Sequence, residues 1–487
     1  MKSGNDILKG VTVVAQQGSF VSAVQAIAFD SREVQKGTLF VAQKGLSADG
    51  HRYIDTAIAK GAMAIVCEEF PQVFHPQVVY VKVADSNLAL AVMASNFYGN
   101  PSEKLILIGV TGTNGKTTVA TLLYELFQKA GRITGLLSTV KIYISDAAFK
   151  ATHTTPDSLT INKYLSEMVA AGVSHCFMEV SSHGIHQKRT AALDFDGGIF
   201  TNLSHDHLDY HKTFLEYRDV KKRFFDNLPK AAFALVNADD KNGAVFLQNT
   251  KAKKVTYALK TMADFRAKIV ERNVSGMLMA LEGQEVWVRL IGDFNAYNLL
   301  SIYATANLLG MESQEVLRLM SELNSVDGRF DYTISKENIL TIVDYAHTPD
   351  ALKNVLQTIE GLRTGSGKII TVMGCGGDRD QDKRSKMGHI ASFLSDQVIF
   401  TSDNPRFEDP QVIIDQIEAG VLPENSKKTL AISDRKQAIK AACKLAKSGD
   451  ILLVAGKGHE SYQEIEGVRI PFDDKTITRT VLEELEK

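Results

Sequence analysis

A glycine-rich segment of this 487-residue chain, Gly109-Val110-Thr111-Gly112-Thr113-Asn114-Gly115-Lys116-Thr117-Thr118, contains the residue types that hold a triphosphate. Its glycines let backbone N–H groups turn towards an anion, and a helix that begins after the loop adds the positive end of its dipole. Lys116 would neutralise the β- and γ-phosphates, and the Thr117 hydroxyl would coordinate Mg²⁺. The strict motif has a glycine where this chain has Val110, and here the glycine is displaced to position 109. The segment therefore predicts ATP binding, but motors, kinases and ligases share such a loop.

The elements around this loop predict a doubly wound α/β domain. Residues 104–110 are typical of a buried parallel strand, and residues 119–129 have helical spacing. An ordinary glycine turn would not need this strand–loop–helix context. Further strands are expected at 175–180, 198–202 and 232–237, and helices at 159–171, 214–228 and 296–309. This alternation places helices on both faces of a mainly parallel sheet.

Two more α/β units flank this domain. Before it, strands at 38–41, 64–67 and 78–83 alternate with helices at 54–60 and 88–97, and a turn rich in Gly, Asn and Pro marks a linker at 98–102. After it, strands at 339–345, 369–373, 397–401 and 451–455 predict a Rossmann-like unit. We therefore expect an α/β protein of three domains at residues 1–102, 103–331 and 332–487, the central one a P-loop ATPase. The length of 487 residues fits this number.

The composition excludes several classes of protein. Lys and Arg total 55 and Asp and Glu total 57, so the chain has no excess of basic residues. The composition therefore gives no reason to expect nucleic acid or an anionic membrane as the partner. No run approaches the roughly 18 apolar residues of a membrane span, and residues 1–20 lack the apolar core of a secretory signal. The cysteines, Cys67, Cys176, Cys375 and Cys443, form no CxxC pair. We therefore expect a cytoplasmic protein without membrane insertion, working as a monomer.

The loop variant at residues 111–118, Thr-Gly-Thr-Asn-Gly-Lys-Thr-Thr, resembles that of the Mur ligase family, the ATP-dependent amino-acid ligases that build the peptidoglycan peptide. Further segments similar to family signatures follow in the expected order at residues 154–157, 178–184, 201–211, 292–295, 328–330 and 344–350. Within the family, residues 374–380, 403–406 and 456–460 are most similar to the members that add 2,6-diaminopimelate to UDP-N-acetylmuramoyl-L-alanyl-D-glutamate.

The resemblance implies a function and a role for each domain. Residues 1–102 would bind the UDP-sugar, residues 103–331 would bind ATP, and residues 332–487 would bind the incoming amino acid, meso-2,6-diaminopimelate. ATP would phosphorylate the terminal carboxylate of the sugar nucleotide, and the free amine would attack this acyl phosphate. Both steps gather negative charge, so Mg²⁺ and fixed cations are expected at the site. Such a reaction belongs to the cytoplasmic synthesis of peptidoglycan precursors, and so to cell-wall biogenesis, cell shape and cell division.

The resemblance also implies the catalytic and metal-binding residues. Lys116, Lys221, Glu179 and His207 would be catalytic, and Thr117, Glu179, His207 and Lys221 would hold the metal, Lys221 as a carbamate formed with CO₂. Oxygen ligands suit Mg²⁺, and a histidine ligand would also be compatible with Mn²⁺. From charge alone, Lys221 with Lys222 and Arg223 would be an exposed helix face. His205, His207 and His211 have a spacing found in some zinc sites, but no cysteine or fourth ligand accompanies them, so we reject zinc.

The remaining expected contacts fall into three groups. For the nucleotide base and ribose, the resemblance indicates Asn295, Arg329 and Asp344, in addition to the loop residues Gly112 to Thr118. For the UDP-sugar-peptide it indicates Ser31, Thr154, Thr155, Ser181, Gln187 and Arg189, together with Leu46-Ser47-Ala48, where relatives usually have His-Gln-Ala. For the amino acid it indicates Arg379, Asp403, Asn404, Pro405, Arg406, Gly456 and Glu460. Arg406 would grip the distal carboxylate, and Asn404 would either accept from the ammonium or hold the turn.

Two other functions compete with this one. Folylpolyglutamate synthase shares the loop and the acyl-phosphate chemistry, but it would lack the N-terminal domain and the Asp-Asn-Pro-Arg segment at 403–406. A non-catalytic, nucleotide-dependent scaffold would not need Lys116, Glu179, His207 and Lys221 together. Cys375 lies in a glycine loop with no base beside it, so we expect a small packing residue there and not a nucleophile.

Overall fold

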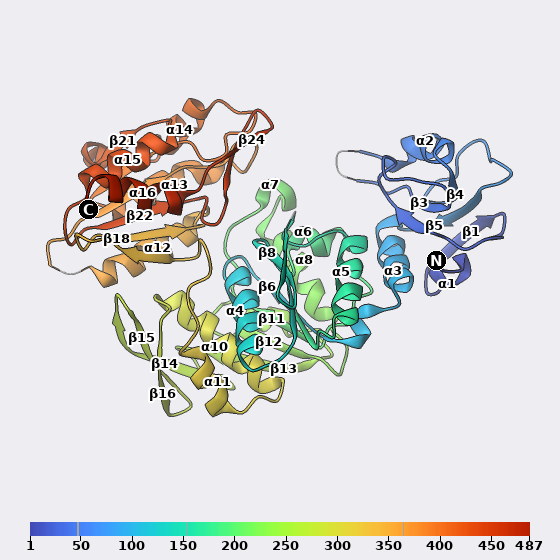
Figure 1. Ribbon diagram of the computed structural model, residues 1–487, viewed down its shortest axis with the longest axis horizontal. Coiled ribbons are helices and arrows are strands. Elements are labelled where there is room, and N and C mark those ends of the chain that lie inside the picture. Colours follow the sequence, from blue (N-terminus) through green and yellow to red (C-terminus); the bar gives the residue numbers. More distant parts are fainter. Residues whose placement is uncertain (46–47, 152, 364) are drawn as a thin grey trace.

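The computed structural model describes residues 1–45, 48–151, 153–363 and 365–487, and these form three α/β units in chain order (Figure 1). The first unit, in blue, lies at the right of the view, and the third, in orange and red, lies at the upper left. The middle unit, in green and yellow, lies between them, so the two chain ends are in the outer units. Residues 46 and 47 of the expected uridine segment lie outside the described residues.

The first unit is built on a sheet of strand order β1-β5-β4-β3-β2, in which only β1 runs antiparallel to its neighbour within the described residues. Its elements are α1 (Gly4–Ile7), β1 (Val13–Gln17), β2 (Ala26–Ala28), β3 (Thr38–Val41), α2 (Ile54–Ala59), β4 (Ala62–Cys67), β5 (Val79–Val83) and α3 (Ser86–Tyr98). Asp85 caps the N-terminus of helix α3, and its carboxylate accepts from the N–H of Leu88. Gly99, in a left-handed conformation, caps the C-terminus. It packs against α5 and so connects this unit to the middle one.

The middle sheet has strand order β16-β15-β14-β13-β12-β11-β6-β10-β7-β8-β9, and the strands from β13 to β7 are parallel. Its strands are β6 (Ile106–Thr111), β7 (Thr134–Leu137), β8 (Lys141–Ile144), β9 (Ala147–Lys150), β10 (His175–Glu179), β11 (Gly197–Phe200), β12 (Phe233–Asn237), β13 (Lys253–Ala258), β14 (Phe265–Asn273), β15 (Gly276–Leu281) and β16 (Gln284–Val288). The antiparallel extension β14–β16 was not predicted from the sequence.

Helices cover both faces of the middle sheet. They are α4 (Lys116–Lys129), α5 (Ser158–Ala170), α6 (Ser182–His186), α7 (Leu208–His211), α8 (Phe214–Asp226), α9 (Gly243–Phe246), α10 (Asp293–Leu308) and α11 (Ser313–Met320). One apolar core joins α4, α10 and α11 to the sheet, and a second joins α5 and α8. The expected doubly wound fold is therefore confirmed.

The third sheet has strand order β17-β18-β22-β19-β20-β21, with β17 antiparallel to β18 and the other neighbours parallel. Its elements are β17 (Asp331–Ile334), β18 (Leu340–Asp344), α12 (Pro349–Leu362), β19 (Ile369–Met373), α13 (Asp382–Leu394), β20 (Gln397–Phe400), α14 (Pro410–Glu418), β21 (Thr429–Ala431), α15 (Arg435–Leu445), β22 (Ile451–Ala455), the hairpin β23 (Tyr462–Ile465) and β24 (Val468–Pro471), and α16 (Asp474–Glu484). The predicted strands correspond to β18, β19, β20 and β22. The edge strands and the hairpin were not predicted.

Short 3₁₀ turns at Gly50–Tyr53, Pro101–Lys104 and Pro423–Lys428 complete the described elements. Within the described ranges, each helix is too short or too polar to cross a bilayer.

Candidate active site

A cavity of about 1260 Å³ is lined by both the middle and the third units, at the ends of their parallel strands. The predicted site residues on its walls are Thr113, Asn114, Gly115, Lys116, Thr117, Thr118, Thr154, Thr155, Glu179, Ser181, Arg189, His207, Lys221, Arg329, Arg379, Asp403, Asn404, Arg406, Gly456 and Glu460. A second cavity of about 610 Å³ is also lined by Asn114, Gly115 and Arg329, and it is faced by Asn295 and Asp344. Among the described residues of the predicted set, Ser31, Gly112, Gln187 and Pro405 line neither cavity.

The phosphate loop is held open by two glycines in left-handed conformations. Gly112 has φ 147°, and a Cβ on it would lie 2.0 Å from Oγ1 of Thr201. Gly115 has φ 86°, and a Cβ there would lie 2.6 Å from Oδ1 of Asn298. The unusual Val110 is fully buried inside β6, before the loop begins, so the departure from the strict motif leaves the loop itself unchanged.

Two lysines converge on one carbonyl of this loop. Nζ of Lys116 lies 2.9 Å and Nζ of Lys221 also 2.9 Å from the carbonyl oxygen of Gly112. Lys221 is 1% exposed and its ammonium lies 4.9 Å from the centre of the Tyr217 ring. Burial, and then the charge of Lys116, hold the pKa of Lys221 well below its usual range. Because α8 packs this side against the loop, the exposed helix face expected from charge alone is wrong for Lys221, and also for Lys222, which is buried beside Asp226.

Glu179 and His207 offer ligand atoms beside the loop. Glu179 is fully buried at the end of β10; its Oε1 accepts from the N–H of Thr139 at 2.7 Å, while its Oε2 is buried without a partner. His207 has φ 54°, and burial lowers the pKa of its imidazole to about 4 although Asp206 opposes this shift. A buried carboxylate oxygen without a partner and a neutral imidazole both suit a divalent cation.

Among the described residues, no three His, Cys, Asp or Glu side chains are placed to hold a metal ion together. A metal at Glu179 and His207 would therefore take its other ligands from hydroxyl or phosphate oxygens or from a modified lysine. His205 is exposed, whereas His211 is fully buried and packs against the rings of Tyr210 and Tyr217.

Arg329 joins the two cavities. Its guanidinium lies 4.4 Å from the centre of the Tyr345 ring, and its Nη2 donates to Oγ1 of Thr117 at 3.1 Å. Asp344 accepts from the N–H of Phe330 at 2.6 Å, and burial raises the pKa of its carboxyl to about 6, with Arg329 opposing. The Asn295 amide donates to the carbonyl of Ile291 at the mouth of the second cavity. These groups leave a polar-lined pocket next to the phosphate loop.

The expected peptide contacts divide into lining and supporting residues. Arg189 lines the cavity and donates through Nη1 to the carbonyl of Thr155 at 2.7 Å. Gln187 lies outside the cavity, and its Oε1 accepts from Nη2 of Arg189 at 2.6 Å. Gln187 is therefore placed to orient Arg189. Ser31 belongs to the first unit, away from both cavities.

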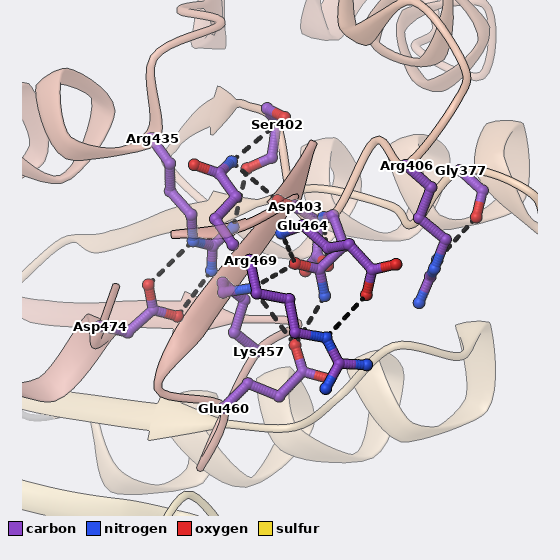
Figure 2. A network of polar contacts seen from close by, with 12 residues as sticks. Gly377, Ser402, Asp403, Arg406, Arg435, Lys457, Glu460, Glu464, Arg469 and Asp474 are labelled. Carbon is purple, nitrogen blue, oxygen red and sulfur yellow. Dashed lines mark hydrogen bonds and ion pairs between the residues drawn. The ribbon is translucent and has the colours of Figure 1, made fainter. Parts of the chain in front are cut away.

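The segment at 403–406 follows β20 as predicted, and a polar network supports it (Figure 2). Arg406 has φ 53° and donates through Nη1 to the carbonyl of Gly377 at 2.6 Å, which joins this loop to the loop of Arg379. The amide of Asn404 donates to Oε2 of Glu460 at 2.8 Å.

The network also contains residues that the sequence did not indicate. Lys457 is fully buried beside Asn404, and Arg435 forms a fully buried ion pair with Asp474 (Figure 2). Arg384, also fully buried, pairs with Glu408 under the loop. Lys457 lies within the family-like segment at 456–460, so the sequence could have indicated it. The other pairs join residues far apart in the sequence.

Family models match consecutive parts of the chain: the Mur ligase family, catalytic domain, at residues 23–98, the Mur ligase middle domain at 110–306, and the Mur ligase, glutamate ligase domain at 328–458. A UDP-N-acetylmuramoyl-L-alanyl-D-glutamate–2,6-diaminopimelate ligase from Cytophaga hutchinsonii is 55% identical over 483 residues, which is 99% of each chain. The chain belongs to the Mur ligase family. A protein of the same name from Parabacteroides distasonis is 56% identical over 452 residues, 93% of each chain.

Solved structures agree with this assignment. A structure of UDP-N-acetylmuramoyl-L-alanyl-D-glutamate–2,6-diaminopimelate ligase covers 100% of both chains with a TM-score of 0.70 and 31% identity. MurF ligase from Thermotoga maritima in complex with ADP matches with a TM-score of 0.62 over 95% of this chain and 98% of its own, and at 19% identity it shows the common fold alone. Mur ligases are ATP-dependent ligases, so the family and the class of enzyme expected from the motifs are both confirmed.

Proposed function

We propose that this Mur ligase adds meso-2,6-diaminopimelate to UDP-N-acetylmuramoyl-L-alanyl-D-glutamate, as a cytoplasmic monomer in peptidoglycan precursor synthesis. The observation that carries the proposal is a single cavity lined by Lys116 and Thr117 of the phosphate loop and by Asn404, Arg406 and Glu460 of the third unit. A ligase needs this arrangement because an activated carboxylate must meet its amine before water does. The names of the relatives at 55% and 56% identity give the substrates.

The chemistry then has two steps at one place. An oxygen of the terminal carboxylate attacks the γ-phosphorus of ATP, and ADP leaves with the bond's electron pair. The free amine of diaminopimelate attacks the acyl carbon, and phosphate leaves. Lys116 neutralises the phosphates in the first step, and Arg189 holds the peptide end of the sugar nucleotide beside them.

The second cavity is the proposed place of the adenosine, with Asn295, Arg329 and Asp344 as its contacts. The remaining ligand groups follow the motif assignments: Gly112, Thr113, Asn114, Gly115 and Thr118 for the phosphates, Ser31, Thr154, Thr155, Ser181 and Gln187 for the sugar-peptide, and Arg379, Asp403, Pro405 and Gly456 for the amino acid. The units at 1–102, 103–331 and 332–487 would bind the UDP-sugar, ATP and the amino acid in that order.

Thr117, Glu179, His207 and Lys221 are the residues we assign to Mg²⁺, which when bound supplies charge neutralisation on the phosphates. The partnerless Oε2 of Glu179 supports this assignment. Lys221 is a fully buried amine whose hydrogen-bond partners, the Gly112 carbonyl and the Thr111 hydroxyl, are both neutral. Its neutral form would add to CO₂ and release a proton, and the carbamate so formed would supply the missing anionic ligand.

A ligation assay with a panel of amino acids tests the proposal. Phosphate release should require ATP, UDP-N-acetylmuramoyl-L-alanyl-D-glutamate and meso-diaminopimelate together, and the product should contain both substrates by mass spectrometry. Phosphate release that instead follows a folate-type substrate, or that needs neither acceptor nor amine, would refute the assignment.

A further inference from the structure

Lys457 is a fully buried lysine in the wall that faces the incoming amino acid (Figure 2). Its Nζ lies 2.8 Å from Oδ1 of Asn404 and 3.2 Å from Oε2 of Glu460, and it also lies 5.6 Å from the centre of the Tyr462 ring. A lysine is rarely buried completely unless it is paired, because desolvation of the ammonium is costly. All the polar atoms it meets belong to the amino-acid subsite.

These contacts fix the orientation of the Asn404 amide. Oδ1 accepts from Nζ of Lys457 and from the backbone N–H of Glu464 at 2.9 Å, and both of these groups can only donate. Both lone pairs of Oδ1 are therefore occupied. Nδ2 donates to Glu460 at 2.8 Å and keeps one further N–H. Asn404 can offer a donor to a ligand but no free acceptor, so it does not accept from the substrate ammonium.

Glu460 can supply an acceptor for that ammonium. Its Oε2 is occupied by Lys457 and Asn404, whereas its Oε1 has no hydrogen-bond partner among the described residues. Burial and the nearby Asp403 raise the pKa of the Glu460 carboxyl, and Lys457 is the largest influence that lowers it.

Two other cations of this region, Arg435 and Arg469, are already paired. Arg435 donates to both oxygens of Asp474 at 2.8 and 2.7 Å, and Arg469 pairs with Glu464 at 3.3 Å. Asp403 accepts from the N–H of Asn404 at 2.7 Å, and Tyr345 is a neutral phenol. Lys457 is the cation within hydrogen-bond distance of the Glu460 carboxylate.

We propose that Lys457 is a positioning residue for amino-acid recognition: it fixes Asn404 as a donor and keeps Glu460 ionised, with Oε1 free for the ammonium of the substrate. The inference rests on the proposed function, since it takes the amino acid to bind at this wall. It goes further because one buried lysine, which does not touch the substrate, determines that Asn404 is a hydrogen-bond donor and that Glu460 is an acceptor.

The test is Lys457→Met, which keeps an unbranched side chain one atom shorter and removes the charge. The KM for meso-diaminopimelate should rise about 10- to 100-fold at neutral pH, the size expected for one lost hydrogen bond to a charged group. The KM values for ATP and the sugar nucleotide should stay unchanged, and kcat should fall less than KM rises. Without the lysine, the pKa of Glu460 is higher still, so the ratio of variant to wild-type KM should shrink as the pH is raised.

A double variant separates this role from a merely structural one. In a Glu460→Gln background, Lys457→Met should have little further effect on the KM for the amino acid. Lys457→Arg, which restores a cation, should recover part of the affinity and serves also if the Met variant does not fold. Lys436→Met removes an exposed lysine from the same unit and is the matched control.

Each outcome decides between the hypotheses. An unchanged KM for diaminopimelate, a ratio independent of pH, or an equal rise in all three KM values overturns the positioning role. A wild-type enzyme that does not ligate diaminopimelate overturns the proposed function instead. Failure of the arginine variant to recover any affinity also counts against the role of the charge.

Discussion

Replacement of Arg406 by glutamine tests how the two ends of the amino acid are distinguished. Nη1 of Arg406 donates to the carbonyl of Gly377, so the loop occupies one of its five donors, and the residue lines the cavity. A distal carboxylate would take two of them in parallel. Hydrogen bonds to charged groups contribute about 1.5–3 kcal/mol each. Because Arg406 is partly exposed, we use the lower value, about 3 kcal/mol for the pair, which is roughly 10²-fold in rate.

The assay compares kcat/KM for meso-diaminopimelate and for lysine, which lacks the distal carboxylate. For Arg406→Gln, kcat/KM should fall about 10²-fold with diaminopimelate and little with lysine. The ratio of the two kcat/KM values should therefore be smaller than in the wild-type enzyme. Arg406→Lys keeps the charge but not the fork, so it should lie between wild type and the glutamine variant. Arginine, glutamine and lysine would all occupy the same left-handed backbone position at residue 406, so the comparison is between side chains. If the glutamine variant weakens both amino acids equally, or if the wild-type enzyme uses lysine as well as diaminopimelate, the reasoning is wrong.

Three more outcomes are expected. Lys116→Ala should lower the ligation rate by about 10²–10³-fold, because one donor to developing phosphate charge is lost; a loss of less than about tenfold would contradict its assignment. Lys221→Ala should be nearly inactive and should regain part of its activity with added formate or acetate, which supply the anion of the carbamate; a fully active variant would exclude the carbamate. Arg435→Met should lower the free energy of unfolding by about 3–5 kcal/mol, because it leaves Asp474 buried and unpaired; a denaturant midpoint equal to that of the wild type would show that the pair contributes nothing.

The strands that carry the site could be predicted because each is a short apolar run followed by glycine or polar residues. The runs at 104–110, 175–180, 397–401 and 451–455 became β6, β10, β20 and β22, and the site loops leave their ends. The strand β14 was missed for the opposite reason. Only Ala267 of this strand is buried, and exposed charged side chains such as Arg266, Lys268 and Glu271 interrupt any apolar run.

Motifs in the sequence indicated the candidate site residues, but they did not indicate the buried charged residues that support them. Charged residues are read from a sequence as exposed, yet Lys221, Arg384, Arg435 and Lys457 are all buried. The pair Arg435–Asp474 joins residues 39 positions apart, and nothing local marks either of them. Gln187 supports Arg189 from outside the cavity, and Ser31 lies in the first unit, which was expected to bind the UDP-sugar.

The two walls of the cavity differ in how their cations are satisfied. On the middle wall, Lys116 and Lys221 donate to a backbone carbonyl and Arg329 donates to a hydroxyl, so each has a neutral partner. On the third wall, Lys457 and Arg469 already pair with carboxylates, whereas Arg406 donates to a backbone carbonyl. An anion that arrives at the middle wall replaces neutral partners with charged ones and gains the stronger interaction. The third wall offers this gain at Arg406, and it also presents the carboxylate of Glu460, so we expect it to select a ligand with charges of both signs. We therefore expect phosphate and acyl phosphate on the middle wall and the zwitterionic amino acid on the third wall, which is the arrangement that attack of the amine on an activated carboxylate requires.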